Sequence, residues 1–160
     1  MKRGVRFLAV ALVCAIWAAP GLAALMPIEG VWKLDEKSSK NVPESQKMID
    51  LKIEVPRGRE FRFSRLYDGA MVGEVLVVSI DGKPVQREVA KGQTATISME
   101  WKAGGRLLEQ IVRLKQTNLM DTVQTTHFTV TDDGEVMTRF QTIRAAGDVT
   151  ERVLIYRRKK

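Results

Sequence analysis

The regular spacing of turn signals is the feature that most limits how this chain can fold. Beyond residue 55, turn sequences recur at short intervals, and Asp-Gly pairs among them tolerate the positive φ angles that tight hairpins require. They are PRG at 56–58, YDG at 67–69, IDG at 80–82, KGQ at 91–93, AGG at 103–105, DDG at 132–134 and AGD at 146–148. We interpret them as hairpins between neighbouring strands, because the intervals are too short for long helices.

Between these turns, apolar and polar residues alternate. MIDLKIEV at 48–55 places apolar side chains at every second position, and TATISMEW at 94–101 repeats the pattern. A period of two is typical of strands with one buried face. The segment 35–47 could hold a turn or two of helix, limited by Pro43. We predict nine or ten strands, at 28–34, 48–55, 59–67, 70–80, 84–90, 94–102, 106–115, 119–131, 135–144 and 149–157.

Short hairpin connections make consecutive strands antiparallel neighbours. So many strands in one sheet normally close on themselves to remove their edges. We therefore predict an all-β fold, a single antiparallel up-and-down β-barrel of about 8–10 strands. A two-sheet sandwich is the alternative, because a sequence does not reveal which connections cross between sheets.

The N-terminus resembles a secretory signal peptide. Lys2, Arg3 and Arg6 precede the apolar run FLAVALVCAIWAA, and the small-residue sequence PGLAA follows it. We predict cleavage after Ala23, an exported protein in the periplasm or secreted medium, and one domain at 24–160. An uncleaved anchor is the alternative, although the apolar run is shorter than the roughly 20 residues that span a bilayer.

Removal of this segment changes the composition of the folded domain. Cys14, the only cysteine, leaves with it, and Val13 before it argues against lipidation. Three of the 26 basic residues also leave, so 23 basic residues face 19 acidic ones and the net charge falls from +7 to +4. Apart from the terminal YRRKK, charges of both signs are interspersed. We therefore expect a monomer with no nucleic-acid partner and at most weak contact with a membrane surface.

A Gly-x-Trp sequence opens the first predicted strand. Gly30 and Trp32 share a face with Ile28 and Leu34, so the indole is expected to point into the core. GVWKLDEKS resembles the opening strand of bacterial lipocalin-like proteins of the calycin superfamily, and TDDGEVMTRF and ERVLIYRR extend the likeness. The resemblance implies a barrel whose closed end is plugged by Trp32. It also implies an arginine of the last strand packed across the indole, either Arg157 or Arg158. We assign Gly30, Trp32 and Arg157 to this barrel-closing group.

The side chains that catalysis or metal binding would need are few. His127 is the only histidine, and no sequence typical of a nucleophile elbow or phosphate loop occurs. We therefore expect no enzyme activity, no metal site and no cofactor. His127 is interpreted as a surface or hydrogen-bonded histidine, and haem ligation, as in small barrels resembling nitrobindin, is the alternative.

Some strands carry polar residues on faces that otherwise look buried. Arg65 has the parity of Phe61 and Phe63, and Gln110 that of Leu108. A lumen that holds a ligand tolerates such residues better than a dry core does. We therefore predict a binding protein for a small, partly apolar ligand, in which Arg65 or Arg152 meets an acidic head group and Tyr156 donates a hydrogen bond. The alternative is a structural or interaction barrel whose lumen is filled by its own side chains. The predicted ligand-binding residues are Phe63, Arg65, Met99, Trp101, Phe140, Arg152 and Tyr156.

Overall fold

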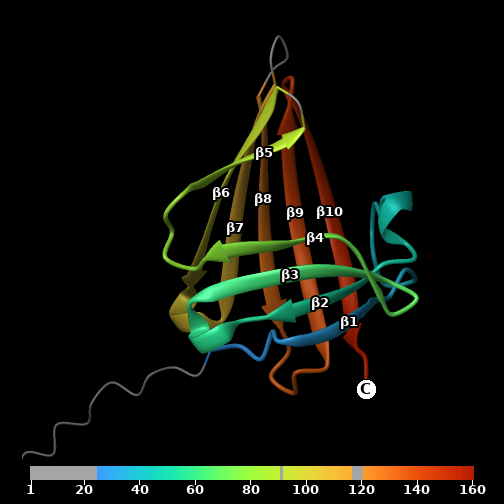
Figure 1. Ribbon diagram of the computed structural model, residues 1–160. Coiled ribbons are helices and arrows are strands. Elements are labelled where there is room, and N and C mark those ends of the chain that lie inside the picture. The colour runs from blue at the N-terminus through green and yellow to red at the C-terminus, as the bar shows by residue number, and fades with distance from the viewer. Residues whose placement is uncertain (1–24, 91, 117–120) are drawn as a thin grey trace, which may run out of the picture.

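The computed structural model describes residues 25–90, 92–116 and 121–160. Within these ranges, ten strands form one antiparallel sheet (Figure 1). They are β1 (Gly30–Leu34), β2 (Asp50–Glu54), β3 (Glu60–Tyr67), β4 (Ala70–Ser79), β5 (Val85–Ala90), β6 (Gln93–Lys102), β7 (Leu107–Gln116), β8 (Thr122–Val130), β9 (Val136–Ala145) and β10 (Asp148–Arg158). The predicted signal segment, with Cys14, lies outside the described residues.

The predicted strands and most of the predicted turns are confirmed. Each strand overlaps its predicted range, and the ends differ by a few residues. In the β3–β4 hairpin, Asp68 and Gly69 have φ angles of 47° and 78°, the paired positive values of a tight hairpin turn. The segment 35–47 contains one short 3₁₀ turn, η1 (Glu44–Gln46). Two further 3₁₀ turns, η2 (Pro56–Gly58) and η3 (Ala103–Gly105), coincide with predicted turns.

The sheet curls into a nearly closed barrel. Its strand order is β4-β3-β2-β1-β10-β9-β8-β7-β6-β5. The first and last strands in the chain, β1 and β10, pair with each other, and β4 and β5 are the two edges of the sheet. The predicted antiparallel up-and-down barrel is therefore confirmed in a form with one gap. No helix in the described part of the chain is long and apolar enough to span a bilayer.

The gap corrects one expectation, because the IDG turn at 80–82 does not join paired strands. The backbone N–H of Gly82 donates to the carbonyl oxygen of Met99 on β6, and Pro84, just before β5, has no N–H to offer. Across the gap, Nη2 of Arg87 on β5 donates to the carbonyl oxygen of Val77 on β4, 3.0 Å away. A side-chain hydrogen bond thus joins β4 and β5, where a closed barrel would have backbone hydrogen bonds between the two strands.

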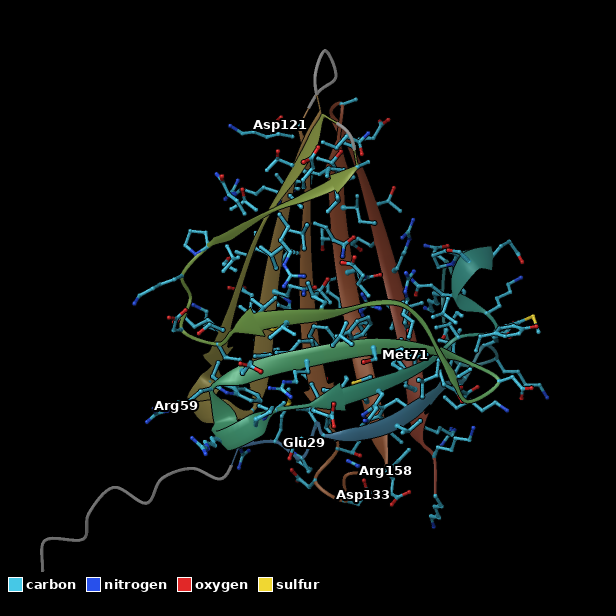
Figure 2. The ribbon with its side chains drawn as sticks, in the orientation of Figure 1. Glu29, Arg59, Met71, Asp121, Asp133 and Arg158 are labelled. Atoms are coloured by element: carbon cyan, nitrogen blue, oxygen red, sulfur yellow. The ribbon has the colours of Figure 1, made fainter. Side chains whose placement is uncertain are left out.

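The two halves of the barrel differ in shape. Strands β1 to β4 run across one end, and β6 to β10 continue beyond them to the opposite tip, where Asp121 lies (Figures 1 and 2). The largest buried apolar side chains gather mainly at the end crossed by β1 to β4, which is therefore the packed end. They include Trp32, Ile53, Phe61, Leu108, Phe128, Met137 and Leu154.

Candidate ligand-binding site

The packed end is closed by Trp32. The indole is fully buried, and its Nε1 donates a hydrogen bond to the carbonyl oxygen of Ile28, 2.9 Å away. The guanidinium carbon of Arg158 lies 4.4 Å from the ring centroid, a favourable cation-π distance. Figure 2 shows Arg158 at this end of the barrel. Its nitrogens donate to the carbonyl oxygens of Pro27, Glu29 and Gly134.

Arg158, rather than the assigned Arg157, covers the indole. Trp32 and Arg158 are direct partners in the β1–β10 ladder, so their side chains lie on the same face of the sheet. Arg157 points to the opposite face, where its Nε lies 2.9 Å from Oδ2 of Asp35. The alternative arginine named from the sequence is therefore the correct one.

Gly30 makes room for this arginine. Its φ angle of +142° lies in the region that favours glycine, and an added Cβ would collide with Nη1 of Arg158. The Gly-x-Trp sequence thus has a local explanation in this chain. The tryptophan supplies the plug, and the glycine leaves space for the cation that covers it.

Further into the barrel, four polar side chains form a row across the inner face. Gln110, Thr126, Gln141 and Arg152 are successive cross-strand partners on β7, β8, β9 and β10. The first three are buried, as predicted for Gln110. Nε2 of Gln141 lies 3.3 Å from Oγ1 of Thr126, but Oε1 of Gln141 has no partner. A buried amide oxygen without a partner is uncommon and carries a desolvation cost.

Arg139 lies on the same inner face of β9, two residues before Gln141. It is 9% exposed, and its guanidinium carbon lies 5.5 Å from the ring centroid of Phe63 and 5.6 Å from that of Phe128. Its Nε has no hydrogen-bond partner. Within the described residues, no carboxylate lies within ion-pairing distance of Arg139. A buried cation without a counter-charge is costly, so this arginine marks a place where a ligand anion would be stabilised.

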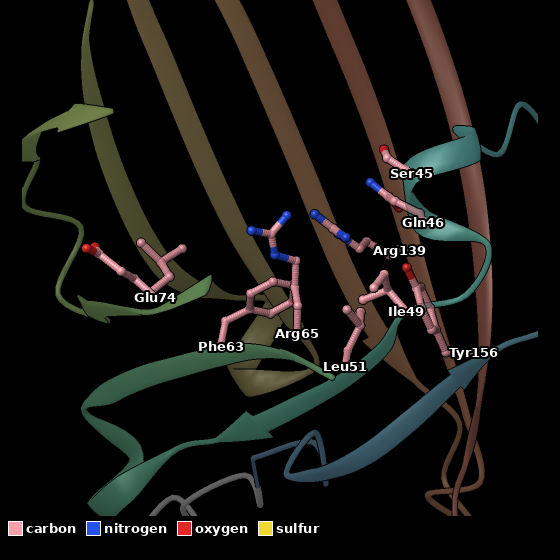
Figure 3. A pocket seen from close by; sticks show the side chains of 10 residues that line it. Ser45, Gln46, Ile49, Leu51, Phe63, Arg65, Glu74, Arg139 and Tyr156 are labelled. Atoms are coloured by element: carbon pink, nitrogen blue, oxygen red, sulfur yellow. The ribbon is translucent and has the colours of Figure 1, made fainter. Parts of the chain in front are cut away.

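A cavity of about 330 Å³ opens beside Arg139 (Figure 3). This volume lies at the lower end of the range for small-molecule sites. The wall combines apolar side chains from β2 and the residue before it, β3 and β4 with polar ones from η1, β3, β4, β9 and β10. The apolar residues are Ile49, Leu51, Phe63 and Leu76, and the polar ones are Ser45, Gln46, Arg65, Glu74, Arg139 and Tyr156.

Arg65 lies on the cavity side of β3, paired with Leu51 of β2, and it faces an irregularity in β4. Phe63 pairs with Leu76 but Arg65 pairs with Val72, so β4 has extra residues opposite β3. Gly73 lies in this bulge with a φ of +74°, and an added Cβ would come within 3.0 Å of Nη2 of Arg65. In Figure 3 the guanidinium groups of Arg65 and Arg139 both extend into the space above Phe63, whereas the Glu74 carboxylate points away from them.

Tyr156 forms part of the cavity wall on β10. It is 1% exposed, and burial raises the pKa of its hydroxyl above the usual 10.0, while the nearby Arg139 guanidinium offsets part of the rise. At neutral pH the phenol is therefore protonated and can donate a hydrogen bond to a ligand.

The structure brings three of the seven predicted ligand-binding residues to this cavity, namely Phe63, Arg65 and Tyr156. Met99 is packed in the core, and Arg152 belongs to the polar row. Trp101 lines a separate cavity of about 220 Å³ near the packed end, where its Nε1 lies 3.4 Å from the carbonyl oxygen of Gly58.

Phe140 needs correction, because it lies on the outer face of β9. Its ring stacks near that of His127, with centroids 6.5 Å apart. The inner face of β9 carries Met137, Arg139 and Gln141 instead. The expectation assumed that the aromatic residue faces inward. The sequence reasoning also missed Arg139, although its parity with Met137 was an available signal.

His127 lies away from the cavity. Its Nε2 lies 3.0 Å from Oε2 of Glu109, on the outer side of the sheet. Among the described residues, no group of three His, Cys, Asp or Glu side chains is placed to bind a metal ion.

Comparison with protein-family models, curated protein sequences and solved structures finds no match for this chain.

Proposed function

We propose that this chain is an exported binding protein that holds a small, partly apolar ligand by an acidic group beside Arg139. The observation that carries the proposal is a buried guanidinium without a carboxylate partner among the described residues, next to a cavity with apolar walls. A ligand anion would supply the missing counter-charge, and Phe63 and Leu76 would contact the apolar part. Binding without catalysis is the function we infer.

Location and family complete the proposal. The N-terminal sequence supports export to the periplasm or the medium, and a monomer stays part of the proposal. The Gly-x-Trp strand and the arginine on its indole are the features that this chain shares with lipocalin-like proteins, which supports a place beside the calycins.

Calorimetric titration of the purified protein with short-chain carboxylates and phosphate monoesters tests the proposal. We expect saturable binding of at least one of these classes. Arg139→Met should weaken it at least tenfold, or about 1.4 kcal/mol, because the neutral side chain leaves the ligand charge unpaired. Arg113→Met removes an outward-facing arginine of β7 and should leave the affinity unchanged. If neither class binds at millimolar concentration, the filled-lumen alternative replaces the carrier.

A further inference from the structure

The cavity contains more positive charge than one carboxylate can neutralise. Arg139 and Arg65 both line it, and neither forms an ion pair with a described residue. Glu74 is the one carboxylate among the lining residues, and its side chain points away from both guanidinium groups (Figure 3). A ligand with a single negative charge would pair with only one of the two guanidinium groups.

The wall also supplies hydrogen-bond donors from several directions. Arg139, Arg65, Tyr156 and Ser45 come from four different elements, β9, β3, β10 and the η1 turn. A carboxylate has two oxygens, whereas a phosphate group has three terminal oxygens that accept hydrogen bonds in three directions. Guanidinium groups match phosphate in both charge and geometry.

Arg139 is held in place before any ligand arrives. Phe63 and Phe128 lie near its guanidinium group, with ring centroids at similar distances of 5.5 and 5.6 Å, while its Nε remains unpartnered. Arg65 is more exposed and lies at the rim, beside Gly73. Arg139, fixed inside the cavity, and Arg65 at the rim could therefore bind one head group from two sides.

We propose that the acidic group is a phosphate-type dianion, and that the ligand is a small phosphate monoester with a short apolar substituent. This inference rests on the proposed function and specifies its ligand class. The volume sets the size, because about 330 Å³ corresponds to roughly eleven water-sized groups. Hexyl phosphate, with a similar number of heavy atoms, is a suitable probe.

Four ligands measured by calorimetry at pH 8 separate the effects of head-group charge, head-group shape and the apolar substituent. Hexyl phosphate carries two charges, hexyl sulfate has the same tetrahedral head with one, and heptanoate has a single planar carboxylate. Inorganic phosphate lacks the apolar part. We expect hexyl phosphate to bind at least tenfold tighter than each of the other three. A lysophosphatidic acid presents the same head group on a longer lipid chain, and tighter binding of it than of hexyl phosphate would assign a lipid source and overturn the short apolar substituent.

The pH dependence gives a second readout. The second pKa of a phosphate monoester is about 6, so the advantage of hexyl phosphate over hexyl sulfate should shrink toward pH 5. The titratable groups that line the cavity are Arg65, Arg139, Glu74 and Tyr156. Arginine side chains are not deprotonated in proteins in this range. The Glu74→Gln variant shows whether the one lining carboxylate contributes to the pH dependence. A constant ratio between pH 5 and pH 8 would overturn the dianion assignment.

Variants distinguish failure of this inference from failure of the proposed function. Arg65→Met should remove most of the preference for phosphate over sulfate while binding of both persists through Arg139. Glu74→Gln should change the preference less than about twofold, because its carboxylate points away; a tenfold rise would mean that it already neutralises one guanidinium. If heptanoate binds as tightly as hexyl phosphate, the dianion is wrong and the carrier stands. If none of the ligands binds, both fail.

Discussion

Arg158 and Trp32 face each other across the β1–β10 ladder, and the guanidinium carbon of the arginine lies 4.4 Å from the centroid of the indole. This contact lies where β1 and β10, the first and last strands in the chain, pair within the sheet. Because β1 is short and pairs with only the C-terminal part of β10, side chains must strengthen the joint. The same guanidinium also binds three backbone carbonyls, so one residue ties several segments together.

Replacement of Arg158 should therefore destabilise the fold far more than replacement of its neighbour. Arg158→Met should lower the free energy of unfolding by about 2–4 kcal/mol, since it removes hydrogen bonds from a charged donor and leaves carbonyls unpaired. Arg157→Met breaks only an exposed pair with Asp35 and should cost less than about 1 kcal/mol. Urea unfolding measures both. Equal losses would mean that the cover on Trp32 contributes nothing.

Gly30→Ala should be destabilising by about 2–4 kcal/mol, because it adds a steric collision with Arg158 to an unfavourable φ angle. Gly147→Ala is the matched control. Its φ is +90°, but nothing lies within 4 Å of the added Cβ, so only the backbone cost of about 1–2 kcal/mol applies. Thermal or urea unfolding gives the comparison. A Gly30→Ala loss no larger than the control would show that Arg158 moves away freely.

The strands could be predicted from the sequence because two local signals coincide. Period-two alternation in 48–55 and 94–101 and the turns between the runs report on backbone conformation near each residue. The gap between β4 and β5 could not be predicted in this way. The IDG turn has the same local chemistry as the true hairpin turns, and only contacts distant in sequence, such as Gly82 with Met99, decide that the two strands separate.

The site was harder to predict, because polar residues occupy inward-facing positions that are usually apolar. Hydrophobic parity places Phe140 inside β9, but Arg139 and Gln141 occupy the inner face. Arg65 was correctly associated with the lumen by its parity with Phe63, but the bulge at Gly73 that leaves space beside its guanidinium group is not revealed by the alternation. On this inner face, buried positions are occupied by polar side chains, so burial does not imply an apolar residue there.

Arg139→Met should leave the stability of the ligand-free protein unchanged or raise it. Burial of a cation without a counter-charge opposes folding, and an apolar side chain of similar length removes that cost. Leu154→Ala, at a core position on the adjacent strand, should lose about 2–5 kcal/mol and shows that the assay responds. Differential scanning calorimetry measures both. A large loss in Arg139→Met would assign the arginine a structural role in place of a ligand-binding one.

Arg87→Ala should loosen the open edge of the barrel without unfolding it. The variant removes the hydrogen bond to the Val77 carbonyl that joins β5 to β4. Backbone amides of β4 should exchange faster with deuterium, because detachment of an edge strand costs less than global unfolding. The unfolding free energy should change by less than about 1.5 kcal/mol, the net value of one such bond. Uniform exchange throughout the sheet would contradict a local role.

Titration of Tyr156 tests whether its hydroxyl is buried beside the Arg139 guanidinium group. The chain has two tyrosines, so in a Tyr67→Phe background the tyrosinate absorbance comes from Tyr156 alone. Burial raises the pKa of Tyr156, and its midpoint should therefore lie above 10.0. Arg139 favours the tyrosinate, so Arg139→Met should move the midpoint still higher, whereas Arg113→Met should leave it in place.

The raised pKa of Tyr156 also predicts how stability depends on pH. Below pH 10 the tyrosine keeps its proton in both the folded and the unfolded state, and above pH 10 the unfolded chain ionises first. Stability should then fall as the pH rises from 10 toward the folded-state pKa. A midpoint below 10, or one unchanged by Arg139→Met, would show that Arg139 and Tyr156 do not interact and would contradict the arrangement of the site.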